Sequence, residues 1–227
     1  MPTTTRRAQQ RESTRDEIKR AALEQVATEG AGALSIRGVA RAIGMSPAGL
    51  YRYYDGLDDL LTELIADAYN DLADAVAALT ARPGPALPRL RAGMLAYRRW
   101  ALDNPHRFLL VFGTPIPGYA APEGGPTVQA NQRIGEAFLL PLVDGWRDGE
   151  VDLPAPRRRP TPGERAFAEQ AGPGFPPQAV GTFLSAWAHF HGMVTLEVLG
   201  QLDWVYPDAR PWYEAEVDRM LDGWRRE

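Results

Sequence analysis

The stretch LSIRGVARAIGMSPAGLYRYY, residues 34–54, decides the fold. Its first half predicts a short amphipathic helix, because apolar residues recur at helical spacing behind Ser35, whose hydroxyl suits a helix N-cap. Gly44 follows, where a chain that reverses between two helices needs a left-handed residue. The apolar residues that share one side of the predicted helix are Ile36, Val39, Ala40 and Ile43.

A second helix is predicted directly after this turn. Ser46 can cap it, and Pro47 suits its first position, where the missing N–H group costs nothing. Only Leu50 and Tyr54 fall on its buried side, which leaves small residues, aromatic residues and an arginine outside. A helix that enters the major groove of DNA end-first has such a surface. The pattern alone leaves two interpretations open: a DNA-reading helix-turn-helix, or a helical hairpin whose second helix is solvated.

Residues 15–64 resemble the DNA-binding domain of TetR-type bacterial transcriptional regulators in both order and spacing. The residues that carry the resemblance are Gly30, Leu34, Ser35, Ile36, Arg37, Val39, Ala40, Gly44, Met45, Ser46, Gly49, Leu50, Tyr51, Tyr53, Tyr54, Leu60 and Leu61. The resemblance implies that the outward side chains of the two short helices contact DNA. These implied DNA-binding residues are Arg37, Ser46, Pro47, Ala48, Gly49, Tyr51, Arg52 and Tyr53.

Two of these residues are given specific roles. Arg52 is expected to contact guanine, because the guanidinium fork matches the O6 and N7 atoms of that base. Tyr51 is expected to touch a phosphate or a thymine methyl group. One position departs from the family pattern: Leu57 stands where a lysine is usual, and the neighbouring Asp58 and Asp59 would repel phosphate.

Composition excludes several classes of protein. The 227 residues include no cysteine, so there is no disulfide framework, thiolate metal site or thiol nucleophile. No apolar run has the length of a membrane span or the character of a signal peptide, and a cytoplasmic protein is expected. The formal net charge is −4, yet residues 1–54 carry nine basic against five acidic residues. Phosphate binding is therefore expected at the N-terminal end alone.

The sequence predicts an all-α fold, since no strand-like alternation occurs. We expect a flexible basic tail over 1–13, a three-helix helix-turn-helix DNA-binding domain over 14–56, and a helical effector-binding and dimerisation domain over 57–227. Irregular stretches are expected at 113–131 and 152–177, which are rich in glycine and proline. A solvated linker is favoured over a DNA contact for the triplet at 157–159. Helices are predicted over residues 14–29, 57–79, 87–104, 106–112, around 134–146, and over 178–202 and 208–226.

The helix at 178–202 has an aromatic face and an opposite face of small and aliphatic residues. A small-residue stripe lets another helix approach closely, so this face is interpreted as a homodimer surface. The alternative is packing against the last helix of the same chain. The residues assigned to the surface are Gly181, Ser185, Ala188, Gly192, Leu196 and Leu199.

The same helix resembles a C-terminal domain that some TetR-type regulators share, named for its Trp-His-Gly signature. The residues that carry this resemblance are Trp187, His191, Gly192, Leu196, Glu197 and Gly200. It covers residues 87–200 and implies a four-helix dimer interface and an effector pocket enclosed by the fifth to eighth helices. Each aromatic residue could instead belong to the core. The implied pocket residues are Tyr97, Trp100, Phe108, Phe112, Phe138, Trp146, Phe183, Trp187 and His191.

No active site, cofactor site or metal site is predicted. His189 and His191 are two positions apart on a helix, so their side chains diverge by about 200° and cannot share an ion. No phosphate-binding loop or nucleophile elbow occurs in the sequence. The chain is therefore not expected to be an enzyme.

These features together predict a one-component transcriptional repressor. It would bind a palindromic double-stranded DNA operator, an inverted repeat, as a homodimer, and a small-molecule effector of unknown identity would release it. The rival interpretation is a helical small-molecule-binding protein or enzyme with a vestigial DNA-binding head. Leu57, Asp58 and the negative net charge keep that rival open.

Overall fold

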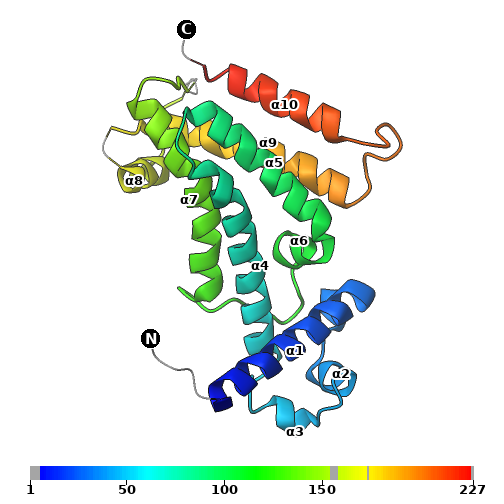
Figure 1. Cartoon of the computed structure of the whole chain (residues 1–227). Helices are drawn as coiled ribbons and strands as arrows, with labels where there is room; N and C mark the ends of the chain where they lie inside the picture. Colours follow the sequence, from blue (N-terminus) through cyan, green and yellow to red (C-terminus); the bar gives the residue numbers. More distant parts are fainter. Residues whose placement is uncertain (1–5, 154–157, 173, 226–227) are drawn as a thin grey trace. The chain divides into compact units, whose positions relative to one another are not determined.

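A computed structural model of the chain describes residues 6–153, 158–172 and 174–225. The described residues form α-helices and one short 3-10 turn, which confirms the predicted all-α class (Figure 1). Among them, no helix combines the length and the apolar composition needed to cross a bilayer. The elements are α1 (Arg6–Glu29), η1 (Ala31–Ala33), α2 (Ile36–Ala42), α3 (Pro47–Leu50), α4 (Leu57–Thr80), α5 (Ala86–Asp103), α6 (Pro105–Phe112), α7 (Pro126–Arg147), α8 (Pro162–Ala171), α9 (Pro177–Val198) and α10 (Arg210–Asp222).

The chain forms two compact units. Unit 1 comprises the described residues up to Asn70 together with Asn104–Asn131, and unit 2 comprises Asp71–Asp103 and the described residues from Gln132 onward. Helices α4 and α7 each contribute residues to both units. The boundary predicted at residue 56 separates a DNA-binding part from an effector-binding part, whereas the two units are defined by compactness. The functional boundary therefore stays a prediction.

Unit 1 is organised around α1, which packs against α2 and α6, while α2 packs against α3. The apolar stripe predicted for α1, which includes Ile18 and Val26, is buried. Leu50 and Tyr54 from the second half of the helix-turn-helix are 0% and 1% exposed and join the same core as Leu60 of α4. Burial of an aliphatic side chain of this size contributes roughly 1.5–3 kcal/mol. The two short helices are therefore held by α1 and α4.

In unit 2, α5, α9 and α10 pack against one another, and α8 packs against α9. Tyr213 is fully buried and donates a hydrogen bond to the carbonyl of Met94, at 2.9 Å. Arg98 of α5 donates to the carboxylate of Glu197 on α9, with Nε 2.7 Å from Oε2. Each side chain of this pair is 12% exposed. Desolvated pairs of this kind fix relative orientation more than they add stability.

The first helix begins earlier than predicted. Residues 6–13 continue α1, and the hydroxyl of Thr14 donates to the carbonyl of Gln10 inside the helix instead of capping it. The reason is that arginine, alanine, glutamine and glutamate, which fill this segment, are strong helix formers. The flexible tail predicted over 1–13 is wrong for these residues, and its first five positions lie outside the described residues.

Both stretches predicted as irregular contain helical residues. Helix α8 lies inside 152–177, where Thr161 at the N-cap and Glu164 form a reciprocal capping box and Pro162 is the first helical residue. Helix α7 begins at Pro126, inside 113–131, because proline is suited to the first position of a helix. Of the arginine triplet, Arg158 pairs with the Glu164 carboxylate at 2.6 Å, and Arg157 lies outside the described residues. Residues 154–156 and 173 of the second stretch, and residue 226 of the last predicted helix, also lie outside them.

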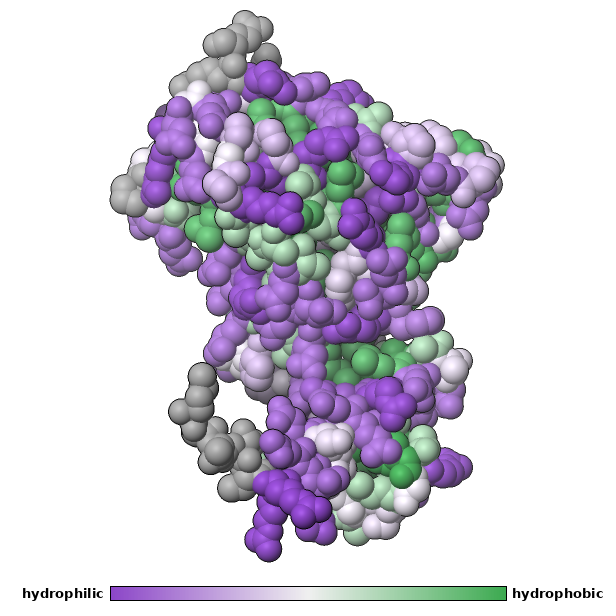
Figure 2. Space-filling model, in the orientation of Figure 1, coloured by the Kyte–Doolittle hydropathy of each residue, from purple (hydrophilic) through white to green (hydrophobic). Residues whose placement is uncertain are grey.

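Hydrophilic residues cover most of the face shown in Figure 2, and hydrophobic residues appear there as separate patches. Trp204, in the connection between α9 and α10, is 85% exposed. The other exposed large apolar side chains are Tyr51, Val128, Leu140, Leu184, Leu196, Leu199 and Val205.

Candidate functional site

Two serine caps and one glycine build the helix-turn-helix. Ser35 Oγ accepts a hydrogen bond from the N–H of Gly38, and Ser46 Oγ accepts one from the N–H of Gly49, both at 3.1 Å. Gly44 between them has φ = 65°, a conformation that only glycine adopts at no steric cost. The structure therefore contains the turn between two capped helices that the sequence predicts.

The outward residues of this element are the candidate DNA-reading surface. Helix α3 is only one turn long, and the chain continues from it through a turn up to Tyr53. The side chain of Tyr51 is 54% exposed. Gly49 and Tyr53 are half-buried, and the exposed members of the predicted set are Arg37, Ser46, Pro47, Ala48, Tyr51 and Arg52.

Gly49 has a packing role in addition to its place on the surface. A Cβ atom at this position would lie 2.9 Å from Cγ of Met45 and 3.3 Å from Oγ of Ser46. Such an approach is closer than carbon atoms tolerate without movement. The absence of a side chain at Gly49 therefore lets α3 begin directly against the turn.

The start of α1 adds basic groups beside this surface. Arg11 donates to the carbonyl of Arg52 at 3.5 Å, and its guanidinium lies 5.8 Å from the ring centroid of Tyr53. Arg7 is one helical turn before Arg11, and both are exposed. Sequence reasoning missed this arrangement because it treated residues 1–13 as a tail. The spacing of four between the two arginines was the available signal.

A cluster of charged side chains fastens α4 to α1. Glu63 of α4 is paired with Arg15 and lies 3.3 Å from Nζ of Lys19, and Asp67 accepts from the same Nζ at 2.9 Å. Burial alone would raise the pKa of Glu63, but the hydrogen bond and charge of Arg15, with those of Lys19, outweigh it and lower that pKa. The beginning of α4 is thereby fixed relative to the helix that supports the reading surface.

The position that departs from the family pattern has a packing function. Leu57 is half-buried and packs against the unit 1 core. Asp58 and Asp59 are exposed in the first turn of α4, and Asp59 Oδ2 accepts from the N–H of Asp55 at 3.1 Å. Carboxylates in the first turn interact favourably with the helix macrodipole, but they repel the phosphates of DNA.

Four members of the predicted effector set lie together in unit 2. The rings of Tyr97 and Trp187 have centroids 5.6 Å apart, and Trp187 is stacked on His191 at the same distance and 6° between planes. Phe138 joins them, 6.2 Å from Trp187. Phe190, absent from the predicted set, lies 5.1 Å from Phe138. Its place on the aromatic face of the helix could have indicated it.

A polar contact is built into this aromatic cluster. Tyr97 Oη lies 2.8 Å from Nδ1 of His191, and burial lowers the pKa of His191. Tyr97 is 0% exposed and Phe138 is 2% exposed, because the rings cover one another. The cluster thus fits both interpretations left open by the sequence, a core and the wall of a ligand cavity.

The other five predicted effector residues have the following contacts and burial. Trp100 donates its Nε1–H to Asp71 at 3.0 Å, and Phe183 is stacked on Phe167 of α8 with centroids 6.2 Å apart. Trp146 is half-buried. Phe108 and Phe112 belong to unit 1, where their rings are 5.1 Å apart. The effector role of the whole set stays a prediction.

The face of α9 that was assigned to a dimer is accessible in the single chain. Ser185, Ala188, Leu196 and Leu199 are exposed, and a Cβ atom built on Gly192 would meet no other atom within 4 Å. Gly181 and Gly192 are half-buried. The exposure of these residues indicates that α10 leaves this face uncovered, which favours the dimer interpretation over packing against the last helix.

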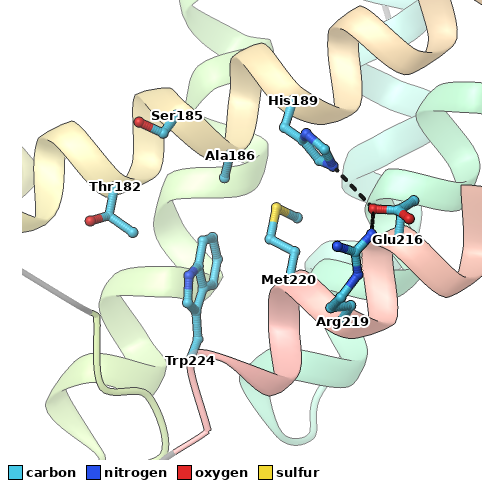
Figure 3. Close-up of a pocket in the computed structure, with 8 residues that line it drawn as sticks. All are labelled: Thr182, Ser185, Ala186, His189, Glu216, Arg219, Met220 and Trp224. Carbon is cyan, nitrogen blue, oxygen red and sulfur yellow. Dashed lines mark ion pairs between the residues drawn. The ribbon is translucent and has the colours of Figure 1, made fainter.

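A groove between α9 and α10 borders this face (Figure 3). Its volume is about 350 Å³. His189 Nε2 lies 3.7 Å from the carboxylate of Glu216, which also pairs with Arg219, while His191 contacts Tyr97. The two histidines therefore have different partners, as their spacing predicted. Within the described residues, no three His, Cys, Asp or Glu side chains gather as a metal site.

Comparison with known proteins supports the all-α fold and the assignment of the N-terminal helix-turn-helix. Residues 18–64 match the family model described as "Bacterial regulatory proteins, tetR family", and residues 90–220 match "Tetracyclin repressor-like, C-terminal domain". The chain is 35% identical over 206 residues to HTH-type transcriptional regulator Rv1816 of Mycobacterium tuberculosis, covering 86% of each chain. HTH-type transcriptional regulator Mb1846 of Mycobacterium bovis is similar to the same extent.

Solved structures show the same architecture. The crystal structure of protein SCO4313 is 36% identical in sequence and has a TM-score of 0.76, covering 96% of this chain and 100% of that chain. A TetR family transcription regulator from Marinobacter aquaeolei shares the fold, with 20% identity, a TM-score of 0.64, and coverage of 96% and 99%.

Proposed function

Because the chain belongs to the TetR family of bacterial transcriptional regulators, we propose that it is a cytoplasmic repressor. It binds an inverted-repeat operator as a homodimer, and a small-molecule effector releases it. The observation that carries the proposal is the doubly capped helix-turn-helix, whose small, aromatic and arginine residues remain exposed. These groups are free to meet base edges and phosphates.

The DNA-binding step follows from the geometry of α3. Pro47 and Ala48 at its start are small, so the backbone can approach the groove floor, and Arg52 extends beyond them with a planar fork for guanine. Tyr51 contacts a phosphate or a thymine methyl group. Arg7 and Arg11 on the first turns of α1 add phosphate contacts beside Tyr53.

Dimerisation uses the accessible face of α9. Two such faces brought together cover Ala188, Leu196 and Leu199, and the small side chains allow a close helix approach. A two-fold dimer presents two copies of α3 to successive major grooves, which is why the operator is an inverted repeat.

Release by the effector is a shift between two states of the dimer. The aromatic cluster around Tyr97 and His191 supplies apolar walls and one polar contact for a ligand that fits only when α4 is displaced. Helix α4 runs without a break from Leu57 to Thr80. Within it, the carboxylate of Asp71 accepts a hydrogen bond from the indole N–H of Trp100. A ligand that binds equally tightly with and without operator would contradict this mechanism, because differential affinity is what shifts the equilibrium.

Selection from a randomised duplex library tests the proposal. Purified protein at about 0.15 M salt, where nonspecific phosphate attraction is partly screened, should enrich an inverted repeat. The affinity for that repeat should fall steeply between 50 and 200 mM salt as counterions are released. A folded dimer that enriches no sequence would favour the rival function, a helical ligand-binding protein whose head does not read DNA.

A further inference from the structure

The exposed apolar side chains of the described residues are concentrated on α9 and the connection that follows it. Of the eight large apolar side chains that are exposed, five lie between positions 184 and 205. These five are Leu184, Leu196, Leu199, Trp204 and Val205. Apolar side chains gathered on one part of a surface mark a place where another molecule binds.

Trp204 is the most exposed of the five, at 85%. Its indole N–H donates a hydrogen bond to the carbonyl of Gln201 at 3.0 Å, inside the same connection. The ring can therefore be buried against another surface without leaving an unpaired donor. Because the same hydrogen bond restricts the ring, little side-chain entropy is lost when the ring docks.

The other end of the α9–α10 pair carries the groove described above. The two helices run in opposite directions from their connection (Figure 1), and the groove lies between the first half of α9 and the second half of α10. Figure 3 shows Met220 and Trp224 between the helices, on the side of Ala186. A volume of about 350 Å³ accommodates an indole ring, which packs favourably against a methionine sulfur or another aromatic ring.

Two-fold symmetry brings this protrusion and this groove together. The accessible positions Ala188 and Gly192 lie near the middle of α9, so a two-fold axis there pairs the helices of two copies antiparallel. The end with Trp204 in one copy then meets the end with Leu184 and the groove in the other. Each contact occurs twice, which is the self-complementarity that a closed dimer needs.

The charges at the two ends are complementary. Asp203, beside Trp204, is exposed, and the groove carries the guanidinium of Arg219, whose side chain is 71% exposed. Glu216 in the same groove is held between Arg219 and His189 of its own chain. Opposite charges at the meeting ends favour this register, and a guanidinium also attracts the face of an indole.

We propose that Trp204 of each copy docks in the groove between α9 and α10 of a second copy of this chain. The two indole rings anchor the dimer at both ends of the paired α9 helices. This inference rests on the proposed homodimer, to which it adds the anchoring residue and the register.

The anchor is tested by measuring the dimer dissociation constant in sedimentation equilibrium without DNA. Trp204→Ala should raise this constant by about 30-fold or more, as expected for a buried tryptophan at the centre of a contact. Leu140→Ala, at an exposed apolar residue of α7, should change it less than about twofold. A dissociation constant of Trp204→Ala equal to that of wild type, or a wild-type protein that stays monomeric, overturns the inference.

Direct contact with the groove is tested by combining substitutions at its two sides. Trp204→Ala and Met220→Ala together should weaken the dimer less than the product of their separate effects, by about threefold or more, because both remove the same contact. Trp204→Ala and Leu140→Ala together should give the product. If the effects of Trp204→Ala and Met220→Ala multiply as well, Trp204 does not dock against Met220.

The register is tested by cross-linking, for which a chain without cysteine is well suited. Val205→Cys and Thr182→Cys proteins are mixed, allowed to exchange subunits and treated with a short bis-maleimide. Covalent dimers should form in the mixture and hardly at all in either protein alone, because two-fold symmetry places equal positions at opposite ends. A mixture without covalent dimers, or stronger cross-linking of Val205→Cys to itself, overturns the register.

The outcome is distinguishable from that of the proposed function. A dimer that depends on Trp204 but enriches no operator would remove the proposed DNA-binding function and leave this inference intact. A protein that enriches an inverted repeat, with a dimer insensitive to Trp204→Ala, would do the reverse.

Discussion

Arg15 of α1 donates a hydrogen bond to the carboxylate of Glu63 on α4, and its guanidinium lies 4.7 Å from the ring centroid of Tyr54. The same guanidinium donates to the carbonyl of Tyr53 at 3.3 Å. One side chain thus joins the supporting helix, the end of the reading surface and the start of α4. This contact determines where the reading surface lies relative to α4.

Removing either member of the pair should destabilise the protein. Arg15→Ala and Glu63→Ala should each lower the free energy of unfolding by about 1–2 kcal/mol, because both side chains are partly buried and the hydrogen bond between them is charge-assisted. The double variant should lose less than the sum, with a coupling of roughly 1 kcal/mol in urea unfolding. Arg210→Ala, which breaks an exposed pair with Glu214, should cost about 0.5 kcal/mol or less. Strict additivity of Arg15→Ala and Glu63→Ala would contradict the assigned contact.

Acid should weaken the same contact. The pKa of Glu63 lies below the ordinary 4.5, since the bonds from Arg15 and Lys19 outweigh the effect of burial. The stabilisation is therefore fully present above pH 4.5 and is lost as pH falls through the lowered pKa. The difference in unfolding free energy between wild type and Glu63→Gln should shrink in this acid range. A difference that stays constant from pH 7 to pH 3, by chemical denaturation, would count against the pairing.

Asp58 should oppose DNA binding through its charge. Asp58→Asn should raise the affinity for nonspecific duplex by roughly two- to fivefold at low salt, as one repulsive charge near phosphate is removed. The gain should fade at higher salt because screening shortens the range of the interaction. Fluorescence anisotropy measures both effects, with Asp203→Asn in unit 2 as the control. An equal gain for both variants would show that net charge alone is responsible.

A charge on the small face of α9 should prevent dimerisation. Ala188→Glu places a carboxylate where two helices approach closely, and burying it without a partner is costly. Sedimentation velocity should find this variant monomeric, while Ala81→Glu, at an exposed alanine directly after α4, remains a dimer. If Ala188→Glu also stays dimeric, the dimer uses another surface.

The local elements could be predicted from the sequence because their signals lie within a few residues. Ser35, Gly44 and Ser46 specify caps and a turn that need no distant partner, and the structure has all three. The same type of signal was overlooked at Thr161 and Glu164, whose capping box starts α8 inside a proline-rich stretch. Proline is frequent both in irregular chain and at the first position of a helix, so the proline content of this stretch does not distinguish the two.

The non-local contacts could not be read in this way. Arg15 and Glu63 are 48 positions apart, and nothing in their separate surroundings indicates that they meet. The same holds for the aromatic residues, where periodicity identifies apolar faces but not which faces share a cavity. The stacking of Phe183 on Phe167 of α8, for example, could not be read from the spacing of either residue.

If the proposed function is right, α3 reads DNA sequence and Arg52 reads one guanine in each half-site. The most direct test repeats the library selection with Arg52→Ala and compares its enriched motif with those of wild type and Arg20→Ala, an exposed arginine on α1. Arg52→Ala should lose its preference at one base pair per half-site, a cost of about 1–3 kcal/mol, while Arg20→Ala should keep the wild-type motif. An Arg52→Ala motif identical to that of wild type, with affinity lowered uniformly over all sequences, would show that Arg52 does not read a base.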